Sequence, residues 1–371
     1  MRDNEFLRTR LDELRREGQF RRLPPAREGV DFWSNDYLGF SRRLRFSAAP
    51  TSHAPGSRLI SGNAPATEAL ENRIAAFHGY PAALLFGSGY LANLGLLSCL
   101  ARRTDTIVYD EFIHASLRDG IRLSGATARR CQHNDLDFFA RALTAARSDG
   151  QVFVVTESRF SMDGDTAPLR ALAELCREFG AALIVDEAHA TGLEGSNGAG
   201  MVEALGLQDE VFASVVTYGK APGYHGAAVL GSKGLRDYLV NFSRPFIYTT
   251  APPPVQIAGL EAVYDLLRDE QREAYDTLRR TIAYYRRRCP GHLNGSDAGR
   301  TGPIQVISLP GNEVVMEAES QLADAGYLVK AIRSPTVAAG SERLRLCLHA
   351  FNTESEIDGL LKSLERLTFS R

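Results

Sequence analysis

The stretch PLRALAELCREFGAALIVD, residues 168–186, contains the pattern that decides the fold. A helix is predicted from Pro168 to Gly180, because proline suits a first helical turn and glycine suits a C-terminal cap. Its apolar residues lie along one helical stripe: Leu169, Leu172, Cys176 and Phe179. The continuous apolar run Ala182–Val185 follows directly, as expected of a strand buried on both faces.

Similar short apolar runs recur on both sides of this stretch, separated by helical patterns between about residues 65 and 232. They are Ala82–Phe86, Thr106–Tyr109, Val152–Thr156, Val211–Thr217 and Ala227–Leu230. Strands that alternate with helices predict βαβ crossovers and a mainly parallel central sheet. The fold class is therefore α/β.

The character of the sequence changes near residue 250, where the segment 249–254 (TTAPPP) breaks the pattern. A long helical stretch to about Arg288 follows, then a smaller α+β region. Its predicted elements are strand 304–309, helix 314–325, strands 327–332 and 344–348, and helix 354–367. An amphipathic helix is expected over residues 4–17. We therefore expect an N-terminal segment (1–50), a large domain (51–255) and a small C-terminal domain (256–371), with the boundary within the long helical stretch.

Composition excludes several classes of protein. The 371 residues carry a formal net charge of −2, which gives no reason to expect nucleic acid or an anionic membrane as a partner. The five cysteines are odd in number and none forms a C-x-x-C pair, which argues against a disulfide framework and a zinc site. No secretory signal and no apolar stretch approaching 18 residues is present, so we expect a cytoplasmic protein without a membrane span.

Two charged residues follow two of the predicted strands. Asp186 ends the run Ala182–Val185, where a carboxylate points into the ligand crevice of an open α/β sheet, although it could equally cap a helix. Lys220 follows Val211–Thr217 in a loop of small residues, where desolvation can make a lysine nucleophilic toward an aldehyde. A pyridoxal 5′-phosphate (PLP) site needs two such residues. A lysine forms a Schiff base with the cofactor, and an acid lies beside the ring nitrogen.

A phosphate cradle should accompany this pair. Ser88, Gly89 and Tyr90 follow the strand Ala82–Phe86 and precede a helical segment, so backbone N–H groups can face an anion. Thr217 offers a hydroxyl. A tight turn is the simpler alternative for Gly87-Ser88-Gly89, and its position after a strand favours the cradle.

Two histidines also follow strands, His114 after Thr106–Tyr109 and His189 three residues beyond Asp186. Each alone is more often a core or surface residue. No metal-ligand spacing repeats, so no metal site is expected.

Six segments together resemble the α-oxoamine synthase family of aspartate-aminotransferase-like, fold type I PLP enzymes. They occur in family order: Ser34–Gly39, Gly87–Tyr90, His114–Ser116, Glu157–Asp165, Asp186–His189 and Thr217–Lys220. The resemblance extends from about Phe32 to Leu364.

The resemblance implies a role for each matching residue. Lys220 would hold PLP and later remove the Cα proton, Asp186 would bind the ring nitrogen, His114 would stack on the ring, and His189 would lie near the phenolic oxygen. The phosphate would be held by Ser88, Gly89, Tyr90 and Thr217, with Thr250 acting in the partner subunit of a homodimer with shared active sites. Asn35 and Ser161 would line the pocket. Arg345, rather than Arg343, would bind the amino-acid carboxylate.

Within the family, residues 331–337 and 343–345 are similar to members that condense L-alanine with a pimeloyl thioester in biotin synthesis. Some positions depart from the family pattern: Thr67, Glu194, Pro222, Tyr224, Ser334 and Ala338. They leave the PLP chemistry intact and the acyl partner open. Basic residues near the shortened segment before Arg58 offer a contact for coenzyme A phosphates or an acyl carrier protein: Arg21, Arg22, Arg42 and Arg43.

Three alternatives stay open from the sequence. One is another acyl-CoA condensation of the glycine C-acetyltransferase or serine palmitoyltransferase type, and a second is a PLP aminotransferase. The third is a non-catalytic homologue that binds PLP or a protein partner.

Overall fold

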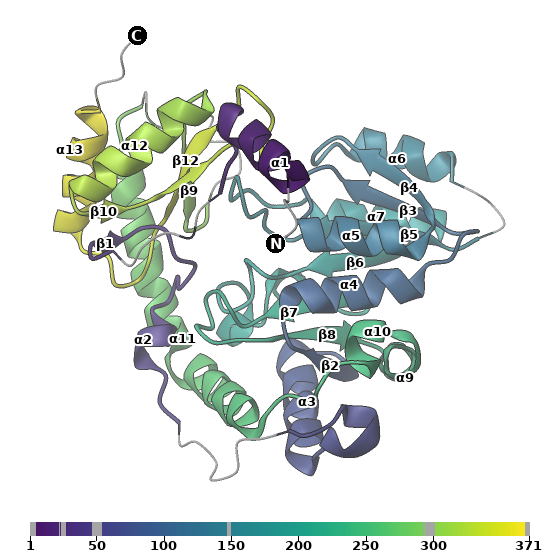
Figure 1. Ribbon diagram of the computed structural model, residues 1–371. Helices are drawn as coiled ribbons and strands as arrows, with labels where there is room; N and C mark the ends of the chain where they lie inside the picture. The colour runs from purple at the N-terminus through teal and green to yellow at the C-terminus, as the bar shows by residue number, and fades with distance from the viewer. Residues whose placement is uncertain are drawn as a thin grey trace. The chain divides into compact units, whose positions relative to one another are not determined.

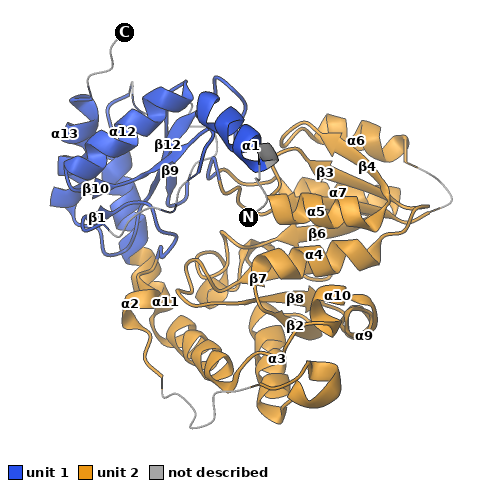
Figure 2. Cartoon of the chain, in the orientation of Figure 1, with its two compact units in different colours: residues 1–37, 162–164, 277–371 blue, residues 38–161, 165–276 orange. Residues whose placement is uncertain are grey.

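A computed structural model describes residues 5–21, 23, 27–46, 54–146, 150–291, 293 and 301–367. The chain divides into two compact units (Figure 2). Unit 1 contains residues 1–37, 162–164 and 277–371, and unit 2 contains residues 38–161 and 165–276. The division falls inside the long helix α11 (Pro254–Arg288), which is the predicted long helical stretch.

Unit 2 is built on a seven-stranded sheet of order β2-β8-β7-β6-β5-β3-β4 (Figure 1). Its strands are β2 (Ala82–Phe86), β3 (Thr106–Asp110), β4 (Thr127–Cys131), β5 (Val152–Glu157), β6 (Ala182–Asp186), β7 (Val211–Thr217) and β8 (Ala227–Gly231). Only β8 runs against its neighbours β2 and β7; the other pairings are parallel. The predicted mainly parallel sheet is confirmed, and the carboxyl ends of six strands meet at one edge.

The helices of unit 2 follow from local sequence signals. α7 (Leu169–Phe179) ends at Gly180, whose φ of 63° is the left-handed conformation that glycine adopts without strain. Its buried residues Leu169, Leu172 and Cys176 are those of the predicted stripe. α4 (Gly89–Leu100) and α5 (Ala115–Ser124) lie side by side along the sheet (Figure 1).

Further helices complete unit 2. They are α2 (Phe40–Arg43), α3 (Pro65–His78), α6 (Leu136–Thr144), α8 (Met201–Ala204), α9 (Lys233–Phe242) and α10 (Arg244–Ile247), with a π-helical turn η1 (Arg58–Gly62) and a 3₁₀ turn η2 (Ser196–Gly198).

The sequence patterns missed strand β4. Its residues TARRC carry no apolar run, and four of the five are exposed or half-buried, because β4 is an edge strand next to β3 alone. Backbone pairing with β3, rather than burial, makes this segment extended.

Unit 1 contains the predicted α+β elements. An antiparallel sheet of order β11-β12-β9 is formed by β9 (Ile304–Ser308), β11 (Lys330–Ile332) and β12 (Arg343–Cys347), and β1 (Val30–Asp31) pairs in parallel with β10 (Tyr327–Leu328). The expected single strand 327–332 is wrong, since it is two strands with different partners. The helices are α1 (Glu5–Arg16), α12 (Asn312–Asp324) and α13 (Glu354–Glu365).

The α13 start has a capping box, in which Thr353 and Glu356 satisfy each other's backbone N–H groups. The predicted amphipathic helix over residues 4–17 is confirmed as α1, but its apolar residues Leu7, Leu11 and Leu14 are exposed in this chain. Among the residues that the structure describes, no helix combines the length and apolar character needed to cross a membrane.

Candidate active site

A cavity of about 190 Å³ lies in unit 2 at the carboxyl edge of the sheet. Nine of the ten residues predicted to bind the cofactor line it: Ser88, Gly89, Tyr90, His114, Ser161, Asp186, His189, Thr217 and Lys220. They come from the last residues of β6 and β7 and from the segments that follow β2, β3, β5, β6 and β7, which are far apart in sequence. The parallel sheet therefore brings them together at the place where open α/β sheets bind ligands.

Lys220 lies two residues beyond buried Tyr218 at the end of β7 and is half-buried. Its Nζ is 3.2 Å from Nε2 of His189. The chain has only four lysines, namely Lys220, Lys233, Lys330 and Lys362. Lys220 alone lines the cavity, so no other lysine of the chain lies where an amine is needed.

Asp186 ends β6 and is 4% exposed. Its Oδ1 accepts a hydrogen bond from the Ala188 N–H (2.8 Å), and its Oδ2 accepts one from Nδ2 of Asn93 (2.6 Å). Asn93 also donates to Ser116 (3.0 Å). The carboxylate is therefore held in a fixed orientation at the cavity wall.

The predicted phosphate cradle is the N-terminus of α4. Ser88 caps this helix by accepting from Leu91 N–H (3.3 Å), and a Cβ on Gly89 would lie only 2.6 Å from Cγ2 of Thr217. The hydroxyl of Thr217 is buried without a hydrogen-bond partner. These features suit the binding of an anion such as a phosphate: a helix N-terminus, a glycine that permits close approach, and a buried hydroxyl without a partner.

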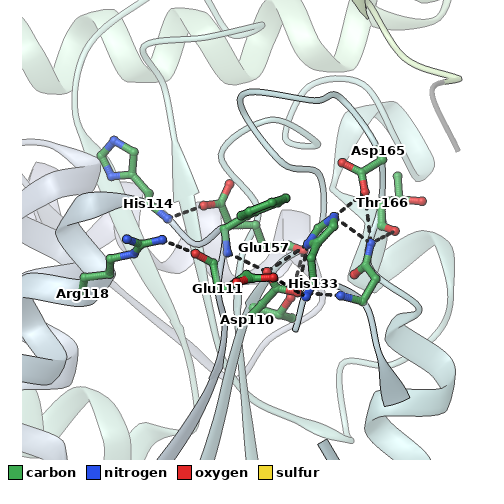
Figure 3. A network of polar contacts seen from close by, with 11 residues as sticks. Asp110, Glu111, His114, Arg118, His133, Glu157, Asp165 and Thr166 are labelled. Atoms are coloured by element: carbon green, nitrogen blue, oxygen red, sulfur yellow. Dashed lines mark hydrogen bonds and ion pairs between the residues drawn. The ribbon is translucent and has the colours of Figure 1, made fainter. Parts of the chain in front are cut away.

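His114 caps α5 by accepting from Ser116 N–H (3.2 Å). The backbone N–H of His114 donates to Oε1 of Glu157 (2.6 Å), and this bond fixes the loop that carries the imidazole ring (Figure 3). Although His114 is exposed overall, partial desolvation lowers its pKa. Burial and the nearby Asp186 raise the pKa of Glu157 well above its ordinary value.

Three predicted residues lie outside this cavity. Thr250 is exposed beyond α10, and its predicted role belongs to a partner subunit. Asn35 and Arg345 are in unit 1, where the buried Arg345 donates to Oδ1 of Asn35 (3.0 Å) and to the Tyr37 hydroxyl (3.3 Å). Arg343 is ion-paired with Asp163. The choice of Arg345 over Arg343 for a substrate carboxylate stays a prediction.

Two of the departures from the family pattern have structural explanations. Glu194, in a segment that is usually apolar, accepts from the buried Arg159 (2.6 Å) and from Tyr275 (3.2 Å). The Tyr224 ring packs edge-on against Phe46 (centroids 5.5 Å apart). Both belong to the packing of unit 2 rather than to the cavity lining.

The basic residues proposed to meet coenzyme A have different settings. Arg43 is ion-paired with Glu270 in unit 2, so part of its charge is already offset. Arg42 is exposed, as is Arg21 in unit 1. Arg22 lies outside the described residues. An acyl-carrier contact at these positions stays a prediction.

Four polar residues that line the cavity were given no role from the sequence alone: Asn93, Ser116, Glu157 and His225. Asn93 had a signal, because it is a buried polar residue in an otherwise apolar helix. Glu157 lies within one of the matching segments. Their roles depend on partners up to 93 residues away, which no local pattern reveals.

The cavity fits PLP by its own chemistry. It offers an amine (Lys220) for the aldehyde, a buried carboxylate (Asp186) for the ring nitrogen, and an anion cradle with a free hydroxyl (Thr217). Within the described ranges, no group of three or more His, Cys, Asp or Glu side chains is placed to hold a metal ion.

Comparisons with known proteins agree with a PLP site in this cavity. A family model described as aminotransferase class I and II matches residues 27–364. The 8-amino-7-oxononanoate synthase of Emericella nidulans is 41% identical, with 97% of this chain and 93% of that protein covered. Among solved structures, 8-amino-7-oxononanoate synthase from Francisella tularensis is 30% identical, with a TM-score of 0.76 and 91% and 97% of the two chains covered. Serine palmitoyltransferase from S. paucimobilis, with PLP and myriocin bound, is 25% identical, with a TM-score of 0.84 and 98% of each chain covered.

The sheet, the cavity and these matches define a PLP-dependent enzyme with the aspartate-aminotransferase-like fold, fold type I. Its chemistry is of the acyltransferase type. Within this class, the chain belongs to the aminotransferase class I and II family, in the α-oxoamine synthase branch that includes the 8-amino-7-oxononanoate synthases.

Proposed function

We propose that this enzyme condenses L-alanine with a pimeloyl thioester, on coenzyme A or an acyl carrier protein, to give 8-amino-7-oxononanoate in biotin biosynthesis. The α-carbon of alanine loses a proton, bonds to the acyl carbonyl carbon, loses its carboxylate as CO₂ and regains a proton. The thiol of the carrier leaves as the C–S bond breaks. The enzyme would act in the cytoplasm as a homodimer, with Thr250 completing the site of the partner.

The observation that supports the proposal most is the 41% identity to an 8-amino-7-oxononanoate synthase over nearly the whole chain. It is joined by the cavity, which gathers an amine, a carboxylate and two histidines at one sheet edge. The segment 331–337 with Arg345 supplies the sequence features of the alanine-using branch.

When bound, PLP supplies the electron sink that makes the α-carbon acidic. Asp186 lies at the cavity wall with both oxygens held by donors, so it is oriented to keep a ring nitrogen protonated. Lys220 is the proposed base for the Cα proton, and His189, 3.2 Å away, is positioned to exchange protons with its Nζ.

His114 would cover one face of the ring, held by its backbone bond to Glu157. The Ser88–Tyr90 turn and Thr217 would anchor the phosphate. Arg345 would bind the carboxylate of the amino acid through two parallel hydrogen bonds before that group leaves as CO₂.

The test uses purified, PLP-loaded enzyme with pimeloyl-CoA and, separately, L-alanine, glycine or L-serine. Release of thiol and CO₂ in equal amounts only with L-alanine, and a product with the mass of 8-amino-7-oxononanoate, is expected. Activity with glycine and acetyl-CoA, or with L-serine and a long-chain thioester, would replace the substrates while keeping the reaction class. Amino-group transfer to a keto acid without CO₂ release would contradict the proposed condensation.

A further inference from the structure

His133 lies outside the cavity lining, yet it sits between two of the loops that form the cavity. It follows the edge strand β4, and β3 lies between β4 and β5 in the sheet. Its neighbours are therefore the loop after β3, which leads to His114, and the loop after β5, which contains Ser161. Figure 3 shows its ring at the centre of a polar network that contains Asp110 and Asp165.

Both ring nitrogens of His133 contact carboxylates. Nδ1 is 2.9 and 3.0 Å from the two oxygens of Asp110, and Nε2 is 2.7 Å from Oδ2 of Asp165. An ionised carboxylate only accepts hydrogen bonds, so two ionised partners favour a proton on each ring nitrogen, that is, an imidazolium. Burial opposes this charge, but the hydrogen bonds to Asp110 and Asp165 prevail and raise the pKa of His133 to about 10.

Two aromatic rings enclose the same imidazole. Phe112, on the loop after β3, lies with its centroid 4.6 Å from the His133 centroid, and Phe160, on the loop after β5, lies 4.4 Å away and edge-on. A charged ring beside aromatic rings gains further attraction. The end of β3 with its following loop thus contributes one carboxylate and one aromatic contact, and the loop after β5 contributes the same.

Asn134 extends the connection along the chain. Its N–H donates to Asp110 (2.8 Å), and its Nδ2 donates to Asp165 (3.0 Å) and to the Thr166 carbonyl (3.2 Å). It adopts a φ of 55° to do so, a conformation that asparagine tolerates better than most residues. His133 and Asn134 therefore hold the same two loops.

We propose that His133 is a positioning residue, which joins the loop bearing His114 to the loop bearing Ser161 and so sets both walls of the cofactor cavity. Asp110 is bound to His133 and accepts from Phe112 N–H (2.8 Å), two residues before His114. Phe160 directly precedes Ser161 and its N–H donates to the Asp165 carbonyl (2.9 Å). Loss of the imidazolium would leave Asp110 and Asp165 without the cation between them and leave Asn134 as the link between the two loops, which should loosen both.

The proposal rests on the predicted roles of His114 and Ser161, but not on the identity of the acyl substrate. The test therefore reads cofactor binding and loop protection. His133→Gln keeps a polar side chain and removes the charge. We expect the dissociation constant of PLP to rise about tenfold, kcat to fall by about 10- to 100-fold, and the visible circular dichroism of bound PLP to change. Amide hydrogen exchange of the apoenzyme should accelerate in residues 110–114 and in residues 158–166.

The matched control is His78→Gln. His78 is buried in unit 2, whereas His133 is half-buried, and it too bonds through both nitrogens, to the Ala199 carbonyl (2.6 Å) and the Tyr264 hydroxyl (2.9 Å). It does not line the cavity. His78→Gln should lower the melting temperature while leaving PLP affinity and the exchange of both loops unchanged.

A His133→Gln enzyme that only melts earlier, with wild-type PLP affinity, circular dichroism and loop exchange, would overturn the proposal. If that variant does not fold, Asp165→Asn serves instead, since it removes one acceptor and keeps the imidazole bound to Asp110. It should accelerate exchange in residues 158–166 and weaken PLP binding; unchanged values would equally overturn the proposal.

Discussion

Two buried polar clusters of unit 2 differ in how completely their groups are paired. In the first, Arg58 donates to both oxygens of Glu71, and its Nε donates to Oδ1 of Asn63 (3.0 Å). Glu71 also accepts a hydrogen bond from the Leu85 N–H (2.9 Å). In the second, the cofactor cavity, the Thr217 hydroxyl and the Asn93 Oδ1 atom are buried without hydrogen-bond partners.

The paired cluster is expected to stabilise the fold, and the unpaired groups are expected to serve ligand binding. A buried ion pair with every bond satisfied has no capacity left for a ligand, and breaking it leaves an uncompensated charge. Unpaired buried groups cost stability in the free protein and are retained where a ligand completes them. We therefore expect substitutions in the cavity to affect chemistry and substitutions in the Arg58 cluster to affect folding.

The largest effect is expected for Lys220→Ala. Without the amine, the chain loses both the attachment point of PLP and the proposed base, so turnover should fall by about 10³-fold or more. The free energy of unfolding of the apoenzyme should change by less than about 1 kcal/mol, since Lys220 is only half-buried. Steady-state kinetics and urea unfolding measure the two quantities, and full turnover in this variant would refute the assignment.

Arg58→Ala should produce the opposite pattern. It removes the bidentate partner of the buried Glu71 and leaves only Arg236, 3.5 Å from Oε2, which should lower the free energy of unfolding by about 3 kcal/mol. Turnover per folded, PLP-loaded subunit should stay near the wild-type value. Arg73→Ala is the matched control, because Arg73 pairs with Glu261 and Asp265 at the surface, where such pairs contribute less than about 1 kcal/mol. Equal losses for the two variants would contradict the distinction.

The fold and much of the cavity could be predicted from the sequence because both depend on strands that are buried on both faces. Strands β2, β5, β6 and β7 are buried on both faces and therefore appear as apolar runs, and the residues that follow them must meet at one edge. That is why Asp186, Lys220 and the turn at Ser88 were recognisable. Family resemblance then supplied the roles of His114, His189 and Ser161.

The remainder depends on the order of the strands in space. His133 meets Asp110 and Asp165 because β3 lies between β5 and β4, and that order is not written in any local pattern. β4 itself was missed because an exposed edge strand has no apolar run. Asn93 could be noticed as a polar residue in an apolar helix, but its partner Asp186 is 93 residues away.

Glu187→Gln tests, through the pH dependence of stability, whether an unpaired buried group near the cavity costs stability. Glu187 is buried beside Asp186 and its Oε1 atom has no hydrogen-bond partner, and burial raises its pKa to about 7. A raised acid pKa means that the folded state favours the protonated form, so stability is lost as pH rises from about 4.5 to 7. The variant should therefore be more stable than wild type by about 1–3 kcal/mol at pH 8.5 and equal to it at pH 4.5.

The matching measurement is thermal or urea unfolding of the apoenzyme at both pH values. A stabilisation that is the same at pH 4.5 and pH 8.5 would show that the charge of Glu187 is not responsible.

The smallest effect is expected for Thr217→Val. It removes a hydroxyl that has no partner in the free protein, so apoenzyme stability should be unchanged or slightly higher. PLP affinity should fall about 5- to 10-fold, since one phosphate hydrogen bond to a charged acceptor is lost. Ser214→Ala is the control, because the Ser214 hydroxyl is already satisfied by Tyr80 (2.5 Å). This control should lose stability while its PLP affinity is retained; weaker PLP binding in Ser214→Ala alone would reverse the assignment.

The most direct test of the central claim is to locate the residue that carries PLP. Holoenzyme is reduced with borohydride, which fixes PLP to its lysine, and the digested peptides are analysed by mass spectrometry. With only four lysines in the chain, the result is unambiguous. The account predicts a pyridoxyl phosphate group on Lys220 alone. Modification of Lys233, Lys330 or Lys362 in its place, or no modification after PLP is supplied, would contradict it.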